Sequence, residues 1–179
     1  MILTEESKQD YTGVGMHITK HRRYVGDYKN GKEHGIGMYN SRYVDGTSLH
    51  NFAGSFNENI STGLGVKHYS YGDLRIGEYK KNQQNGLGLT SVGNEKTWGF
   101  QVSNAIRGPL YIGEMKDHNP YGFGSMIIWS GLKFIGFVNG WCALNGKWYD
   151  EQDNPIDITE LGYEANGRMY KKYKDNNTI

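Results

Sequence analysis

Cysteine, proline and long apolar runs are scarce in this sequence. A single cysteine, Cys142, among 179 residues excludes an internal disulfide and a multi-cysteine metal site, which favours a reducing, intracellular compartment. Only 3 prolines accompany 26 glycines and no Gly-X-Y period occurs, which argues against a collagen-like chain. No apolar run approaches the ~20 residues of a membrane-spanning helix. The N-terminus lacks an apolar core, so we expect no signal or transit peptide.

Net charge is also nearly absent. Lys and Arg total 20 against 19 Asp and Glu, which leaves a formal net charge of +1. Without a positive field over the whole molecule, nucleic acid is not an expected partner. Glycine and aromatic residues are abundant instead. Aromatics make up 13% of the chain, with 14 Tyr, and glycine reaches about twice its usual share of roughly 7%.

The glycines and aromatics recur at a regular spacing. Aligning the aromatic-x-Gly steps gives glycines at positions 26, 54, 77, 99, 113 and 136, separated by 28, 23, 22, 14 and 23 residues. Four of the six are followed nine residues later by a Gly-x-Gly step. Self-similarity at about 23 residues indicates a repeat architecture. The repeat-defining glycines are Gly26, Gly35, Gly37, Gly54, Gly63, Gly65, Gly77, Gly86, Gly88, Gly113, Gly122, Gly124 and Gly136.

Within each unit the side chains alternate with a period of two, which predicts β-strands. Tyr24, Gly26 and Tyr28 share one face, and Val25 points to the other. Glycine costs stability in a strand unless a neighbour fills the space, so we expect aromatic rings to lie across the glycines. Residues that tolerate a left-handed backbone predict hairpin turns. They are Gly31, Asn59, Asn82, Asn104 and His118.

This pattern resembles the MORN repeat, whose unit is roughly Tyr-x-Gly-x-aromatic, a short turn, Gly-x-Gly and a polar turn. The resemblance covers about residues 11–149, and Tyr24 to Gly37 is its best copy. It implies an all-β fold, an open and elongated single-layer antiparallel sheet of six to seven hairpin units that winds into a groove. We therefore divide the chain into a polar N-terminal segment (1–10), the array (11–149), and a cap with a polar tail (150–179).

The units depart from this pattern in the second half of the chain. Arg75 and Thr97 replace the leading aromatic, and the step from Gly99 to Gly113 spans only 14 residues. We interpret this stretch as a unit that has lost about one strand and a turn. Because Pro109 enters there without a backbone donor, an edge or a bend in the sheet is expected.

The glycine pattern stops after Asp150. The sequence from Asp157 to Glu160 matches a helix-capping box, and apolar residues follow at helical spacing. They are Ile158, Leu161, Ala165, Met169 and Tyr173. We therefore expect a short C-terminal helical cap on the last unit.

Sequence motifs for catalysis, metal binding or nucleotide binding are weak. The Gly-x-Gly steps lack the third glycine and the following helix of a dinucleotide fingerprint. His17 and His21 are four residues apart, but no Glu pattern or helix signal surrounds them. Cys142 has no matched base and is interpreted as a buried small apolar residue. We therefore expect no enzyme activity, no catalytic or metal-ligating residues and no cofactor.

The aromatic face has two interpretations. Either the rings only stabilise the sheet, or they line a groove that binds a helix or extended peptide of a partner. The candidate groove residues are Tyr24, Tyr28, Phe52, Phe56, Tyr79, Tyr111 and Phe134, with Trp98 and Trp129 as further anchors. We expect a non-enzymatic interaction scaffold or a subunit of a larger assembly. The resemblance implies a cytoplasmic, cytoskeletal, ciliary or membrane-associated setting.

Two alternatives remain. The basic stretch Lys20 to Arg23 and the lysines of the tail favour weak contact with anionic lipid, as in a membrane-surface adaptor. Each such group contributes only about 1 kcal/mol, and acids nearly match bases in number. Edge strands at either end of the array leave a homodimer as the other alternative.

Overall fold

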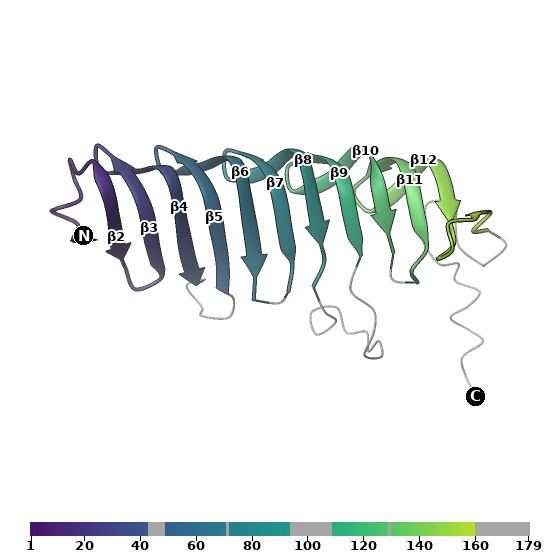
Figure 1. The fold of residues 1–179 in the computed structure, drawn as a ribbon, viewed down its shortest axis with the longest axis horizontal. Helices are drawn as coiled ribbons and strands as arrows, with labels where there is room; N and C mark the ends of the chain where they lie inside the picture. The colour runs from purple at the N-terminus through teal and green to yellow at the C-terminus, as the bar shows by residue number, and fades with distance from the viewer. Residues whose placement is uncertain (43–48, 71, 94–108, 129, 160–179) are drawn as a thin grey trace, which may run out of the picture.

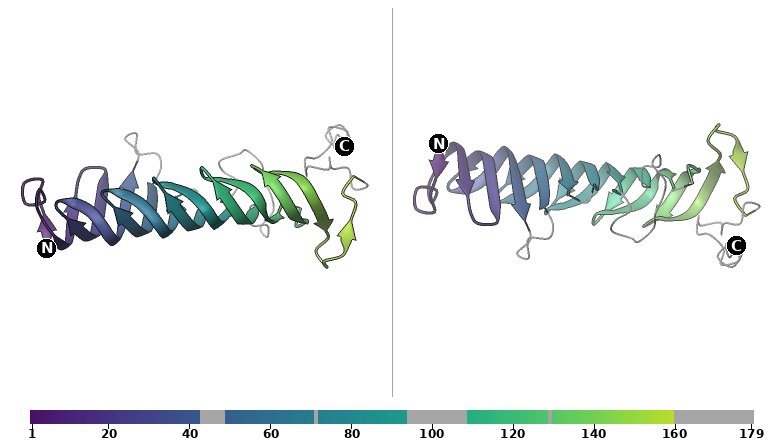
Figure 2. Two further views of the ribbon diagram at one scale, coloured as in Figure 1. Left: turned by 90° about the horizontal axis from the view of Figure 1, so that it is seen from above. Right: turned by 90° about the horizontal axis from the view of Figure 1, so that it is seen from below.

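The chain forms one long β-sheet. The computed structural model describes residues 1–42, 49–70, 72–93, 109–128 and 130–159. These residues contain thirteen strands, and neighbours in the sequence are neighbours in the sheet from β1 to β13. Every pair is antiparallel except β1 and β2, which run parallel. Figure 1 shows the strands in an elongated row, and Figure 2 shows that the sheet twists along its length.

The strands follow the units that the sequence predicts. Their bounds are β1 (Ile2–Leu3), β2 (Gly13–Ile18), β3 (Arg22–Lys29), β4 (Lys32–Arg42), β5 (Leu49–Asn57), β6 (Ile60–Tyr69), β7 (Leu74–Lys80), β8 (Gln83–Ser91), β9 (Leu110–Lys116), β10 (Asn119–Ile127), β11 (Lys133–Asn139), β12 (Cys142–Tyr149) and β13 (Pro155–Ile156). The expected open antiparallel sheet is thereby confirmed.

Tight turns close the hairpins where the sequence places them. At Glu58 and Asn59 the φ angles are 49° and 68°, and the turns ending at Gly31, Asn82 and His118 likewise have two positive φ values. Turns of this kind match the right-handed twist of the flanking strands. The turn predicted at Asn104 lies outside the described residues.

Hydrogen bonds also join each turn to the neighbouring hairpin. The backbone N–H of Asn59 donates to the carbonyl of Glu33 at 2.9 Å, and the Asn59 side-chain oxygen accepts the Glu33 N–H at 2.9 Å. His118 repeats this exchange with Gln84, whose N–H donates to the His118 Nδ1 at 3.1 Å. The turn residue thus fixes the stacking of one unit on the next.

The sheet curls because its hairpins contain bulges. The β3–β4 register shifts between Gly26 and Tyr28, and equivalent shifts occur in the other hairpins. Gly35 and Gly63, with φ of 57° and 60°, supply left-handed backbone in two of them. Because bulges increase twist, the face that carries the rings closes on itself. We call it the inner face, and the opposite one the outer face.

Rings lie across glycines on the inner face, as the sequence predicts. A Cβ placed on Gly26 would lie 2.7 Å from the Tyr24 hydroxyl, and one on Gly65 would lie 2.6 Å from Cε2 of Phe52. Tyr111 covers Gly124 in the same way. The aromatic side chains therefore fill space that only glycine leaves open.

The unit expected between Thr97 and Leu110 is not part of the described sheet. β8 pairs directly with β9, with Gly88 opposite Gly113, and the Val92 N–H donates to the Pro109 carbonyl at 2.9 Å. The sheet therefore continues past Pro109, and the expected edge there is wrong, while a bend stays a prediction. Residues 94–108, which include Gly99 and Gly108, lie outside the described residues.

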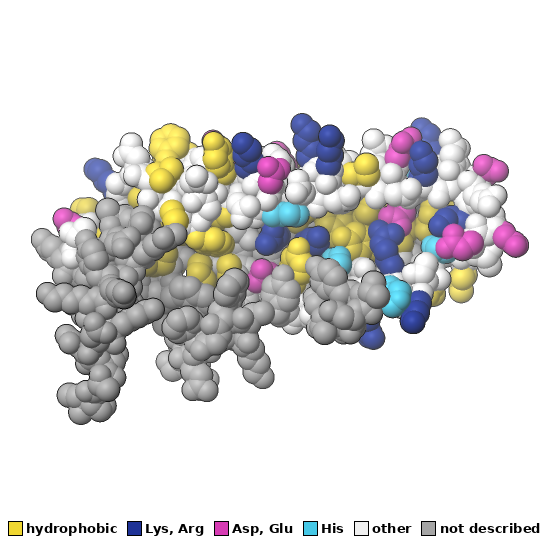
Figure 3. All heavy atoms as spheres, turned by 180° about the vertical axis from the view of Figure 1, so that it is seen from behind, with side chains coloured by type: hydrophobic (Ala, Val, Ile, Leu, Met, Phe, Trp, Pro, Cys, Tyr) yellow, Lys and Arg dark blue, Asp and Glu magenta, His cyan; other side chains and the backbone are white. Residues whose placement is uncertain are grey.

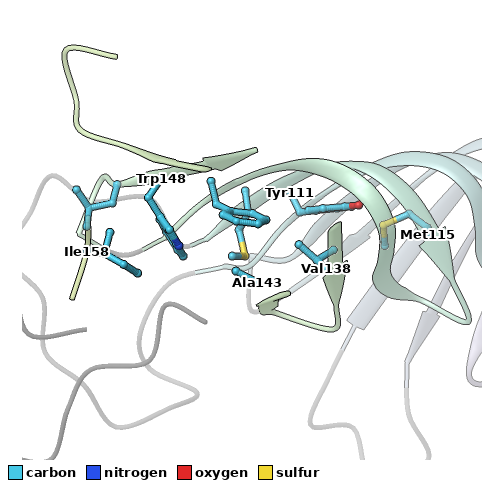
Figure 4. Packing of buried hydrophobic residues seen from close by; sticks show 9 residues of the cluster. Tyr111, Met115, Val138, Ala143, Trp148 and Ile158 are labelled. Atoms are coloured by element: carbon cyan, nitrogen blue, oxygen red, sulfur yellow. The ribbon is translucent and has the colours of Figure 1, made fainter. Parts of the chain in front are cut away.

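The expected C-terminal helix is not seen among the described residues. Pro155 and Ile156 form β13, which pairs with Tyr149 and Trp148. Pairing with β12 satisfies backbone groups that a helix would satisfy internally. Ile158, 2% exposed, packs in one cluster with Trp148 (Figure 4), so the last unit is capped by a strand and a turn. Residues 160–179 lie outside the described residues.

Candidate interaction surfaces

The seven rings predicted to line a groove are buried. Their exposed fractions range from 0% for Tyr111 to 3% for Tyr28, Phe56 and Tyr79. Five of them contact one another edge to face; for example, the ring centroids of Phe52 and Tyr79 lie 4.9 Å apart. The structure thus supports their stabilising role, while direct contact with a partner stays a prediction. Trp98 and Trp129 lie outside the described residues.

The hydroxyl groups of Tyr24 and Tyr111 are held by backbone carbonyls. Tyr24 donates to the Asp27 carbonyl at 3.0 Å, and Tyr111 donates to the equivalent carbonyl of Glu114 at 3.1 Å. Burial raises the pKa of Tyr28 and of Tyr111 to about 12 in each case, because a phenolate would lose its hydration there. The Tyr28 hydroxyl, in contrast, is buried without a hydrogen-bond partner among the described residues.

The inner face also contains a partly buried ion pair. Arg22 on β3 binds Glu33 on β4 through both guanidinium nitrogens, with Nη2 and Oε2 at 2.8 Å. Glu33 is 6% exposed, and the Arg22 guanidinium lies 4.5 Å from the centroid of Tyr39. A paired arrangement of this kind is structural.

Arg75 marks the unit in which the inner face differs. It stands two residues before Gly77, where the other units have a ring. Gln84 occupies the volume that the missing ring leaves. Its Nε2 donates to the carbonyls of Ile76 and Leu89 at 3.0 and 3.1 Å, and the residue is 0% exposed. The replacement of an aromatic by Arg75 is visible in the sequence, but the compensation by Gln84 is not.

The outer face carries large apolar side chains in contact with solvent. A first row runs across the strands through directly paired residues, Met38 to Ala53, Ala53 to Val66, Val66 to Ile76, and on through Leu89 to Ile112. Met38 is 55% exposed, Ile112 53%, and Val66 and Ile76 40% each. We call Met38, Ala53, Val66, Ile76, Leu89 and Ile112 the outer row.

A second row lies two residues closer to the hairpin turns. It contains the residues held between the glycines of the Gly-x-Gly steps, and these are even more exposed: Ile36 66%, Leu64 69%, Leu87 62% and Phe123 50%. Acidic residues alternate with them, because Leu64 pairs with Glu78 and Leu87 pairs with Glu114. We call Ile36, Leu64, Glu78, Leu87, Glu114 and Phe123 the mixed row.

The sequence contained a signal for this surface. Period-two alternation placed Ile76 and Ile112 opposite the rings, and the solvated side of an antiparallel sheet is ordinarily polar. Large aliphatic residues at successive positions of that side are therefore unexpected for a sheet exposed to water. Cys142 on β12 is half-buried, so it is less enclosed than the sequence suggested.

Comparison with known families gives the same repeat as the geometry. The family model of the MORN repeat matches residues 24–47 and 76–90, which cover most of the hairpins β3–β4 and β7–β8. This is a MORN-repeat protein. MORN repeats are generally found in scaffold proteins that bind other proteins or associate with membranes. No curated protein matches the chain.

Two further observations concern membranes and metals. In the part of the chain that the structure describes, no helix is long and apolar enough to cross a membrane. Nor do three or more His, Cys, Asp or Glu side chains gather among those residues in a way that would hold a metal ion.

Proposed function

We propose that this MORN-repeat protein is a non-enzymatic scaffold whose outer face binds a protein partner. The supporting observation is the exposed apolar surface formed by the outer row and the mixed row. Ordinary solvent-facing sheets alternate apolar-in with polar-out, whereas here aliphatic side chains that are 40–69% exposed continue across successive strands. Covering such a surface releases ordered water and stabilises a complex.

The mixed row indicates the chemistry of the partner. Glu78 and Glu114 lie among apolar side chains, and Asp27 lies on the same face, where its Oδ2 accepts the Ile36 N–H at 2.8 Å. A partner segment with apolar residues for Leu64 and Leu87 and basic residues for the two glutamates complements this surface. An amphipathic basic helix meets both requirements.

A membrane surface fits the outer face less well. Insertion of Leu64 and Leu87 into lipid would bring Glu78 and Glu114 to the same depth, which is costly for carboxylates, and anionic headgroups would repel them. Face-to-face association of two copies would also bring these carboxylates together. The sequence favoured a different alternative, in which the partner binds in a groove along the aromatic rings. That alternative requires the partner to contact rings that are only 0–3% exposed.

Two isoleucines provide a matched test. Ile76 in the outer row and Ile60 beside the turn before β6 are each 40% exposed, and Ile60 pairs with Asn57 outside both rows. The partner is first identified by cross-linking and mass spectrometry in the cells that produce the protein. Its affinity is then measured for Ile76→Ser and Ile60→Ser.

We expect Ile76→Ser to weaken binding by about 10-fold, because a buried aliphatic side chain contributes on the order of 1.5 kcal/mol or more. Ile60→Ser should bind normally, and the two variants should have similar melting temperatures. Equal effects of the two substitutions would contradict the proposal. Sedimentation with vesicles of phosphatidylcholine and phosphatidylserine tests the membrane alternative, which requires pelleting that Ile76→Ser abolishes.

A further inference from the structure

The inner face contains a cluster of cations at the unit that lacks its ring. Arg75 on β7 pairs directly with Lys67 on β6, so the two basic side chains are neighbours on the same face. Figure 3 shows Lys and Arg side chains beside His side chains midway along one face of the molecule. In other units, the position of Arg75 belongs to a buried ring such as Tyr111 or Phe134.

One aromatic ring supports both cations. The Lys67 Nζ lies 5.2 Å and the Arg75 Cζ 5.5 Å from the centroid of Tyr69, which is 8% exposed. The Arg75 Nη1 also donates to the backbone carbonyl of His118 at 3.2 Å. The guanidinium is thus held in one place, with its side chain 19% exposed. Its Nε is buried and has no hydrogen-bond acceptor among the described residues.

Among the described residues, little negative charge lies near this cluster. Asp73 approaches the Arg75 Nη2 only to 4.0 Å, and its Oδ1 also accepts the Gly93 N–H at 2.7 Å. Arg22 is neutralised more completely, because Glu33 binds both of its terminal guanidinium nitrogens. Burial and the charge of Arg75 lower the pKa of Lys67, as expected for a cation that is incompletely neutralised.

His118 adds a neutral donor to the cluster. Burial, Arg75 and Lys67 lower the pKa of His118 to about 4, so its imidazole is neutral at pH 7. Its Nδ1 accepts the Gln84 N–H at 3.1 Å, which places the ring proton on Nε2. An ammonium, a guanidinium and an imidazole N–H then belong to one cluster.

We propose that Lys67, Arg75 and His118 form a binding site for a phosphate group. Among the described residues, Asp73 approaches Arg75 only to 4.0 Å and Asp117 hydrogen-bonds Asn85 instead of a cation, so Lys67 and Arg75 are incompletely neutralised. A phosphate dianion neutralises two such cations better than a singly charged carboxylate does. The guanidinium Nη2, the ammonium of Lys67 and the imidazole N–H of His118 are the donors for its oxygens. The site is independent of the outer face, because it lies on the opposite side of the sheet.

The test is a titration of the whole chain with sodium phosphate, and separately with sodium acetate, followed by NMR of the His118 imidazole. Phosphate should give saturable shifts and raise the pKa of His118, since an anion stabilises the imidazolium. R75Q and K67Q should each weaken phosphate binding by about 10-fold or more. Lys80→Gln, at an exposed lysine of the same hairpin, should leave it unchanged.

Vesicles distinguish the two sources of the phosphate group. Binding to phosphatidylcholine vesicles that contain phosphatidylinositol 4-phosphate, lost in K67Q, would identify a lipid headgroup. Binding of free phosphate without such pelleting would identify a soluble phosphate compound. If R75Q does not fold, K67Q alone decides. Absence of saturable phosphate binding, binding that both variants retain, or equal binding of acetate would overturn the proposal.

Discussion

The contact between Phe52 and Gly65 allows a direct test of how the rings stabilise the sheet. A methyl group on Gly65 would lie 2.6 Å from Cε2 of Phe52 and closer still to Cζ, whereas its nearest backbone neighbour, the Ala53 carbonyl oxygen, would be 3.3 Å away. The obstacle is therefore the end of the ring. Overpacking of this kind costs about 1–3 kcal/mol, so Gly65→Ala should lower the free energy of unfolding by that amount.

Leucine at position 52 lacks both of the ring atoms that overlap the new methyl group. We expect Phe52→Leu alone to destabilise the protein by about 1–2 kcal/mol through lost packing. In that background, Gly65→Ala should cost much less than in the native chain. The double-mutant cycle should thus give a coupling of about 1–2 kcal/mol, measured by urea denaturation at equal slopes.

Gly54 is the matched control for this cycle. A methyl group there would meet backbone, with the Leu64 carbonyl oxygen at 2.5 Å and the Gly65 Cα at 2.7 Å. Shortening Phe52 cannot relieve those overlaps, so Gly54→Ala should remain costly in the Phe52→Leu background. If Gly65→Ala and Phe52→Leu are additive, the ring does not require the glycine and the reasoning is refuted.

Two predictions concern pH. Because the pKa of folded His118 is about 4, below its ordinary value of 6.5, the unfolded chain binds more protons between these values and stability should fall as pH decreases through that window. The variant His118→Asn retains a side-chain acceptor, as at Asn59, and should remove much of this loss of stability when it is measured by urea denaturation at each pH. An unchanged pH profile would contradict the lowered pKa of His118. At high pH, the raised pKa of Tyr28 and Tyr111, about 12 instead of 10, should make stability decrease above about pH 10. Ultraviolet titration checks this, and ionisation near pH 10 in the folded protein would argue against burial.

The repeat itself could be predicted from the sequence because its signals are local. A two-residue turn needs left-handed backbone at defined positions, and Asn59, Asn82 and His118 supply it. Alternation with a period of two fixes the side of the sheet on which each residue lies. Rings over glycines follow from the same spacing, and the structure places Tyr24 over Gly26 and Gly37.

Features that depend on distant pairing could not be predicted in the same way. The aromatic-x-Gly spacing counted Gly99 as a unit, but strand β8 pairs with β9, so register in the sheet overrides local similarity. At the C-terminus, the pairing of Pro155 and Ile156 with the open edge of β12 had no local signal, and most of the helix expected after Asp157 lies outside the described residues.

The candidate site was the least predictable part. The sequence identifies which residues share a face, but it does not say how far the sheet closes over that face. Bulges at Gly35 and its counterparts curl the sheet until Phe52 and Tyr111 are 1% and 0% exposed. The exposed surface therefore lies on the side that was given no function, and Leu64 and Ile36, at 69% and 66%, are its most exposed members.

The most direct measurement of the central claim is hydroxyl-radical footprinting of the protein in the complex with its identified partner and of the free chain. If the outer face binds the partner, oxidation of Met38, Leu64 and Leu87 should fall markedly in the complex, while Ile60 remains as reactive as in the free chain. Protection confined to inner-face residues such as Tyr39, with Leu64 and Leu87 unchanged, would contradict it.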